Sequence, residues 1–210
     1  FAAAWEDYDD DGDMDLAVAN DFGRKNLYRN DGGHFKDVAA AAGVEDVGAG
    51  MSAAWGDYDG DGRMDLYVAN MFTPVGSRIA GQPRFQPEAG QPARALLMRH
   101  ARGNSLFRSR GDGSFEDVSV ASGTTMGRWA WSSNFLDADN DGREDLLVTN
   151  GYFTKEDPRD LTSFFWRRVV GRSPLAAADP ATVPEYSAAW RDLGRMIRYG
   201  NVYGNVYGNR

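Results

Sequence analysis

The sequence predicts an all-β fold built from repeated hairpins, and three observations support this prediction. A segment of 18 residues occurs three times along the chain. Each copy reads as an apolar strand, a tight loop rich in Asp, and a second strand in which hydrophobic residues alternate. A second hairpin with a glycine turn follows the first two copies. Repeated hairpins of this kind predict antiparallel sheets.

The long repeat covers residues 3–20, 53–70 and 133–150. In each copy the second strand carries a Leu and a Val two residues apart, so both side chains point to the same face of the sheet. These pairs are Leu16 and Val18, Leu66 and Val68, and Leu146 and Val148. The alternation places each pair on one face of its sheet.

The second hairpin is found at residues 26–38 and again at 106–118. One hairpin of each kind gives a four-stranded sheet, and the 50 residues from Asp7 to Asp57 match the length of one propeller blade. The sequence therefore predicts a partial β-propeller over residues 1–150. Closed propellers need about 4–8 blades, so we expect the exposed blade flank to pack on missing blades or on neighbouring chains.

Two stretches interrupt or follow the repeats. The longer spacing from Asp57 to Asp137 predicts a surface loop inserted at about residues 73–103. Residues 151–200 predict a helical insertion with a capping box at Thr182 and Glu185. Its two apolar stripes are Leu161, Phe164, Phe165 and Val169, and Tyr186, Trp190, Leu193 and Ile197. Residues 201–210 repeat Tyr-Gly-Asn-Val as a low-complexity tail.

Composition excludes several classes of partner. The chain has 31 acidic and 23 basic residues, a formal charge of −8 that argues against binding nucleic acid or an anionic membrane surface. No window approaches the roughly 18 uninterrupted apolar residues of a membrane span. Cysteine is absent, so we expect neither disulfides nor thiol chemistry. Cations are the favoured small partners.

The Asp-rich loops carry the chemistry. Counted from the first Asp, carboxylates occupy positions 1, 3, 5 and 9 of each loop, glycine follows position 5, and position 7 offers a backbone carbonyl. The candidate metal ligands are Asp7, Asp9, Asp11, Asp13 and Asp15; Asp57, Asp59, Asp61, Arg63 and Asp65; and Asp137, Asp139, Asp141, Arg143 and Asp145. About six or seven hard oxygens suit Ca²⁺ better than Mg²⁺ or Zn²⁺. An EF-hand is excluded because it needs Glu at position 12, whereas position 12 of these loops is Val within a predicted strand.

These loops, together with the Gly-x-Phe-x-Asp-Val hairpins, resemble FG-GAP/VCBS repeats. They are particularly similar to those of bacterial proteins related to cartilage acidic protein, which often carry an ASPIC/UnbV domain. The resemblance implies Ca²⁺ bound in the loops of a propeller. It also implies a binding, adhesion or scaffolding module that contacts a protein or glycan, and no enzyme activity. Weak Ca²⁺ sites, which need about 10⁻⁴–10⁻³ M ion, favour an extracellular, cell-surface or periplasmic location.

Other interpretations compete for several residues. The tripeptide Arg110-Gly111-Asp112 could be displayed to an integrin, but glycines at a hairpin turn explain it. His34 and His100 are expected at the surface, and Trp5 and Trp55 in the blade core. A calcium-dependent polysaccharide lyase or hydrolase is the enzymatic alternative, although every Asp with distinctive spacing is already assigned to metal.

Overall fold

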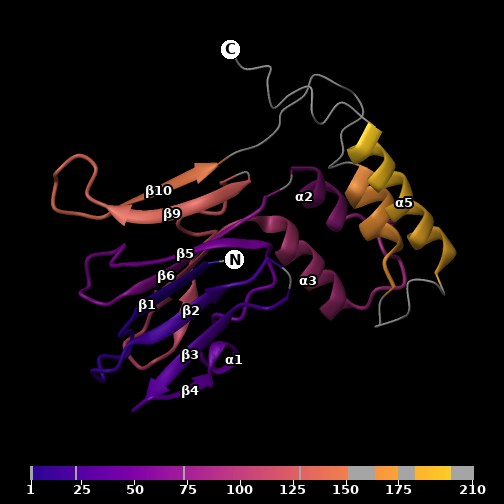
Figure 1. The fold of residues 1–210 in the computed structure, drawn as a ribbon. Coiled ribbons are helices and arrows are strands. Elements are labelled where there is room, and N and C mark those ends of the chain that lie inside the picture. Colours follow the sequence, from indigo (N-terminus) through magenta and orange to yellow (C-terminus); the bar gives the residue numbers. More distant parts are fainter. Residues whose placement is uncertain are drawn as a thin grey trace. The chain divides into compact units, whose positions relative to one another are not determined.

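A computed structural model gives the fold, and it describes residues 2–21, 23–72, 74–127, 129–150, 164–174 and 183–199. The chain divides into two compact units. One comprises residues 1–72 and 99–151, and the other comprises residues 73–98 and 152–210. The first unit contains the repeats and their strands (Figure 1).

The first unit contains two four-stranded antiparallel sheets, each built from one long-repeat hairpin and one glycine-turn hairpin, as the sequence predicts. Sheet 1 has the order β1-β2-β3-β4 and sheet 2 the order β5-β6-β7-β8. Sheet 1 consists of Ala2–Glu6, Asp15–Ala19, Asn26–Asp31 and His34–Asp37, followed by the short helix α1, Ala39–Ala42. Sheet 2 consists of Gly50–Gly56, Asp65–Asn70, Ser105–Ser109 and Phe115–Asp117. The register is equivalent: Leu16 pairs with Tyr28, and Leu66 with Phe107.

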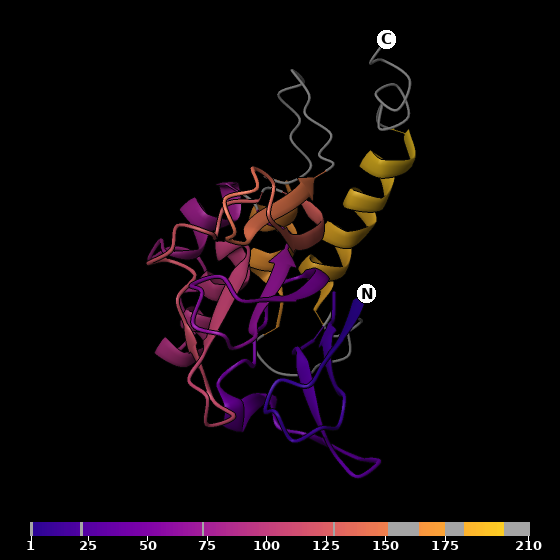
Figure 2. The same cartoon turned by 90° about the vertical axis from the view of Figure 1, so that its left-hand side faces the viewer.

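The third repeat forms sheet 3, in which β9 (Ala130–Leu136) pairs antiparallel with β10 (Asp145–Asn150). The three sheets are layered with sheet 2 in the middle (Figures 1 and 2). Such stacked antiparallel sheets are of the propeller type. A closed ring and blades beyond these three stay predictions.

Both faces of sheet 2 are buried, which alternation in the sequence does not indicate. Leu66, Val68 and Phe107 pack against Ala17 and Ala19 of sheet 1. The opposite face, with Tyr67, Ala69 and Leu106, packs with Phe135, Leu146 and Val148 of sheet 3. Every residue of β6 is therefore buried. In sheet 1 the fully buried face of β2 carries Ala17 and Ala19, while Leu16 and Val18 are only half-buried. The face that carries Leu16 and Val18 is thus the less buried face of sheet 1, because sheet 2 covers the other face.

Buried charges hold sheets 1 and 2 together at the end away from the β1–β2 loop. Asp46, 1% exposed, accepts hydrogen bonds from Arg99 Nε at 3.0 Å and Ser105 Oγ at 2.7 Å. Lys25 Nζ donates to the carbonyl of Asn20 at 2.9 Å and to that of Gly48. Burial alone would raise the pKa of Asp46, but Arg99, Ser105 and Lys25 lower it to about 2. Burial lowers the pKa of Lys25 to about 8 against the attraction of Asp46.

The second unit is helical over its described residues. The surface loop expected at about 73–103 instead contains α2 (Pro74–Ala80) and all of α3 (Gln91–Arg102), whose last four residues belong to the first unit. Pro and Gly in this stretch suggested a loop, but Pro74 and Pro92 stand at helix starts and Gly76 lies within α2, while the others lie between the two helices or after α3. Phe85 lies beside Trp166, with ring centroids 6.2 Å apart.

The described part of residues 151–200 contains the π-helix η1 (Phe165–Val169), the short 3-10 helix η2 (Val170–Arg172) and α5 (Pro184–Tyr199). Val169 of η1 forms a core with Ala189 and Leu193 of α5. These elements agree in type with the predicted helices, whereas an insertion into a propeller stays a prediction. Leu161, Thr182 and the tail 201–210 lie outside the described residues, and so does the capping box.

Candidate metal sites in the aspartate loops

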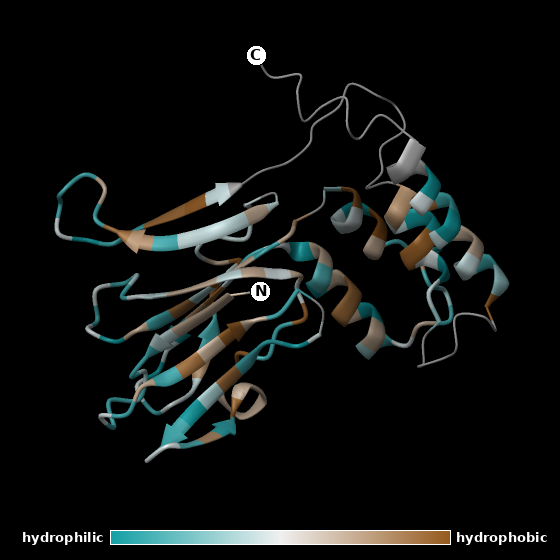
Figure 3. Cartoon of the chain, viewed as in Figure 1, coloured by the Kyte–Doolittle hydropathy of each residue, from teal (hydrophilic) through white to brown (hydrophobic). Residues whose placement is uncertain are grey.

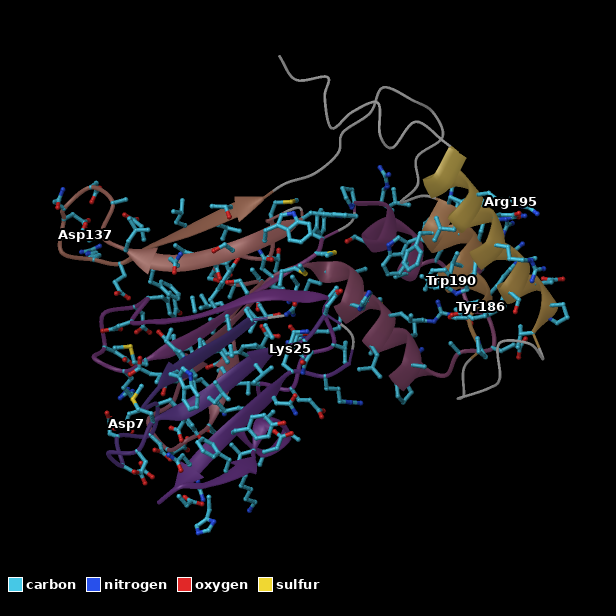
Figure 4. The ribbon with its side chains drawn as sticks, viewed as in Figure 1. Asp7, Lys25, Asp137, Tyr186, Trp190 and Arg195 are labelled. Carbon is cyan, nitrogen blue, oxygen red and sulfur yellow. The ribbon has the colours of Figure 1, made fainter. Side chains whose placement is uncertain are left out.

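The three Asp loops connect β1 to β2, β5 to β6 and β9 to β10, and they lie at the same end of the layered sheets (Figure 1). We call them loop 1 (residues 7–15), loop 2 (57–65) and loop 3 (137–145). Asp7 and Asp137 mark this end, whereas Lys25 lies toward the other (Figure 4). The loops are the most hydrophilic parts of their hairpins (Figure 3).

Backbone geometry is the same in all three loops. The carboxylate at position 1 accepts two backbone N–H groups: in loop 1, Asp7 accepts from Asp11 and Gly12, each at 3.0 Å. Loops 2 and 3 repeat these two bonds with Asp57 and Asp137. The glycine after position 5 has a positive φ in each loop, between 83° and 93°. Three separate stretches of sequence thus each adopt the same loop conformation.

The carboxylates converge in each loop, as ligands of one ion must. In every loop, three Asp residues place a carboxylate oxygen within 4.8 Å of the others. These triplets are Asp7, Asp9 and Asp15; Asp57, Asp59 and Asp61; and Asp137, Asp139 and Asp145. Positions 1 and 3 converge in all three loops, position 9 in loops 1 and 3, and position 5 in loop 2.

The remaining candidate ligands lie outside these triplets, and several have other partners. Asp11 Oδ1 accepts from Asp13 N at 2.9 Å, and the same bond links Asp141 to Arg143. Asp13 Oδ2 accepts from Gly32 N at 2.8 Å and so connects loop 1 to the β3–β4 turn. At position 7 the side chain or the backbone amide is therefore engaged in hydrogen bonds within the protein. The backbone carbonyl remains as the predicted metal ligand.

In loops 1 and 2, position 9 also connects the loop to the third strand of its sheet. Asp15 accepts from Tyr8 N at 3.3 Å and Asn30 N at 2.7 Å, and Asp65 accepts from Tyr58 N and Ser109 N at 3.1 and 2.7 Å. Both side chains are almost fully buried. Burial, together with the neighbouring Asp charges, raises the pKa of each to about 6 despite these hydrogen bonds. Among the described residues, neither carboxylate forms an ion pair with a basic side chain.

Loop 1 shows most directly that a cation fits. Asp9 Oδ1 is buried and has no hydrogen-bond partner among the residues that the structure describes. Leaving a buried carboxylate oxygen unsatisfied is costly, and nearby carboxylates repel one another. Burial, followed by the charge of Asp11, raises the pKa of Asp9. A divalent cation bound by Asp7, Asp9 and Asp15 would satisfy this oxygen and remove the repulsion; hard oxygens of this kind suit Ca²⁺.

Sequence reasoning missed the role of position 4. Asp10 and Asn140 have φ values of 58° and 61°, and Gly60 has 74°. Gly, Asn and Asp are the residues that adopt this left-handed conformation most readily. The restriction of position 4 to these three types was visible in the sequence and indicates a turn shared by all loops.

The other singled-out residues differ from expectation in two cases. Trp5 is not in a core: it is 53% exposed and packs edge-on against Phe35, whereas Trp55 packs against the core between sheets 1 and 2. His100 is half-buried, with Nδ1 2.8 Å from the carbonyl oxygen of Val47, because α3 places it against that segment. His34 is exposed.

The Arg110-Gly111-Asp112 tripeptide forms the β7–β8 turn, where Gly111 has a φ of 73°. Asp112 Oδ1 accepts from the amide and hydroxyl of Ser114, at 3.0 and 2.6 Å. The turn thus uses both the glycine and the aspartate locally. Among the described residues, no helix is long and apolar enough to cross a membrane.

Layered antiparallel sheets with one Asp loop per sheet define a repeat protein of the propeller type. A model of the FG-GAP-like repeat matches residues 7–68 and 95–148, which is more than half of the chain. The chain belongs to the FG-GAP-like repeat family. No curated protein matches the chain significantly. The narrower similarity to cartilage acidic protein and ASPIC/UnbV proteins stays a prediction.

Proposed function

We propose that this chain is a calcium-stabilised repeat module of an extracellular or periplasmic protein, and that it binds or scaffolds a protein or glycan rather than catalysing a reaction. Membership of the FG-GAP-like repeat family supports a binding or scaffolding module. The observation that carries the calcium assignment is the convergence of three carboxylates within 4.8 Å in each of three equivalent loops.

Calcium has a structural role in this proposal. Each loop joins the first two strands of a sheet, and position 9 joins it to the third strand in sheets 1 and 2. An ion that binds the folded loops but not the unfolded chain stabilises the fold by mass action. At 10–100 times the dissociation constant, each site contributes about 1.4–2.7 kcal/mol.

We also propose that the three sheets are consecutive blades of a larger propeller. The face of sheet 1 that carries Trp5 and Phe35 supports this, because the equivalent face of sheet 2 is covered by sheet 1. The surfaces that contact the partner would then be loops at the ends of the blades. A glycan array and a pull-down with extracellular proteins distinguish the two partner classes.

Two neighbouring residues in loop 1 give a matched test of calcium binding. Asp9 belongs to the carboxylate triplet, whereas Asp10 does not, and Asn already occupies the position of Asp10 in loop 3. Asp9→Asn and Asp10→Asn therefore remove the same charge, but only the first removes a proposed ligand. We expect calcium to raise the melting temperature of wild type and Asp10→Asn alike, and to raise that of Asp9→Asn less.

Thermal melts in about 1 mM calcium and in chelator measure this difference. Equal melting temperatures of the wild type in the two buffers would mean that the Asp loops are only turns.

A further inference from the structure

One side chain connects loop 3 to loop 2. Glu144 Oε2 accepts a hydrogen bond from the backbone N–H of Asp57 at 2.7 Å. Asp57 supplies the first carboxylate of the loop 2 triplet. Glu144 directly precedes Asp145, which belongs to the loop 3 triplet. The two carboxylate clusters are thus joined through a single residue that belongs to neither.

The packing around this contact leaves little room. A Cβ on Gly56 would lie 2.6 Å from Glu144 Oε2 and 2.3 Å from Cγ of Phe135. Only a glycine before Asp57 therefore allows Glu144 to reach the backbone of loop 2. Loops 1 and 3 have Glu6 and Leu136 at the position of Gly56.

The chain contains its own comparison for this contact. Glu144 occupies position 8 of loop 3, where loops 1 and 2 have Met14 and Met64. A methionine has no carboxylate to offer, so Met64 cannot make the same charge-assisted hydrogen bond to loop 1. The link between loops 2 and 3 therefore has no equivalent at position 8 of loop 2.

We propose that Glu144 is a positioning residue that couples calcium binding in loops 2 and 3, while loop 1 binds independently. This inference rests on the proposed calcium function. An ion in loop 3 fixes the backbone around Asp145 and hence the carboxylate of Glu144. That carboxylate holds the backbone of Asp57, whose side chain is then oriented toward the ion in loop 2. Such coupling is reciprocal, and a change in affinity of about fivefold or more is expected.

A double-mutant cycle on the full chain tests the coupling. Calcium is titrated while the amide resonances of Gly12, Gly62 and Gly142 report loops 1, 2 and 3 separately. Asp139→Asn with Asp141→Asn disables loop 3. We expect this change to weaken loop 2 by about fivefold when Glu144 is present and to have little effect when Glu144 is replaced by Ala. Loop 1 should keep its affinity in every variant.

Two further variants keep the test decisive. Glu144→Gln preserves size and one acceptor oxygen, so it should weaken calcium binding in loop 2 less than Glu144→Ala does. It also keeps the test informative if the alanine variant misfolds. Met64→Ala is the matched control at position 8 and should leave loop 1 unchanged. If loop 2 weakens equally with and without Glu144, or stays unchanged when loop 3 is disabled, the coupling is wrong while calcium binding stands. If no loop binds calcium, the proposed function and the coupling both fail.

Discussion

Sheets 1 and 2 have nearly the same sequence pattern and the same register. Equivalent residues of the two sheets are nevertheless buried to very different extents. Phe35 in sheet 1 is 48% exposed, and its equivalent Phe115 in sheet 2 is 4% exposed. Leu16 and Val18 are half-buried, whereas their equivalents in β6 are buried. The pattern therefore produces a surface that can pack on a neighbouring sheet, and among the described residues this surface is covered in sheet 2 but not in sheet 1.

The contacts between sheets 1 and 2 show which side chains this pattern brings together. Tyr8 of loop 1 stacks on Trp55 with ring centroids 5.9 Å apart, and Trp55 Nε1 donates to the carbonyl of Ala4 at 3.3 Å. Small residues Ala17 and Ala19 receive the large side chains of sheet 2. The two sheets thus pack a face of large side chains on a face of small side chains. Sheet 1 has its own face of large side chains, and the main aromatic residues of that face are exposed.

The largest expected effect is a difference between two phenylalanines. Phe115→Ala removes a buried ring from the core between the sheets and should lower the free energy of unfolding by about 3–5 kcal/mol. Phe35→Ala removes an exposed ring and should change it by less than about 1 kcal/mol in this chain. Urea denaturation of both variants in calcium measures the two values. Similar losses would show that the face of sheet 1 is covered in solution.

A smaller effect is expected at the buried charges of the same junction. Asp46→Asn leaves Lys25 and Arg99 without their shared carboxylate and should lower the free energy of unfolding by about 2–3 kcal/mol at neutral pH. Since the pKa of Asp46 is lowered to about 2 in the fold, the unfolded chain binds more protons between pH 4 and 2. Its contribution is therefore fully present above about pH 4 and is lost as the pH falls toward 2.

The comparison of wild type with Asp46→Asn isolates this contribution. Acidic groups that do not contact Arg99 cancel in the difference, whereas Asp117, whose pKa is also lowered, shares Arg99 with Asp46. Acid denaturation should therefore destabilise the wild type more than Asp46→Asn between pH 4 and 2. A constant difference between the two proteins over this range would contradict the role of Asp46.

Much of the repeat unit could be predicted from the sequence because its signals are local. The alternation of hydrophobic residues predicted the strands, and the glycine turns predicted the hairpins. The spacing of the Asp residues predicted the loops. The helices α2 and α3 were missed because Pro and Gly mark helix ends as often as loops. The exposure of Trp5 was missed because burial depends on neighbouring layers, which no local pattern reports.

The convergence of carboxylates in the loops could be predicted from the sequence in outline, whereas metal binding there stays a prediction. The spacing indicated carboxylates at positions 1, 3, 5 and 9, whereas the structure brings together three of them in each loop. Which oxygen points inward depends on backbone bonds such as those from Asn30 to Asp15, a contact across 15 residues. Contact between Glu144 and Asp57 spans 87 residues and has no local signal.

A crystal structure of the chain grown in millimolar calcium tests the central claim most directly. Our account expects one ion in each of the three loops, with the convergent Asp oxygens at about 2.4 Å and the carbonyls of Asp13, Arg63 and Arg143 completing the shells. Loops without ions under these conditions, or carboxylates that point apart, would contradict the assignment of these loops to calcium.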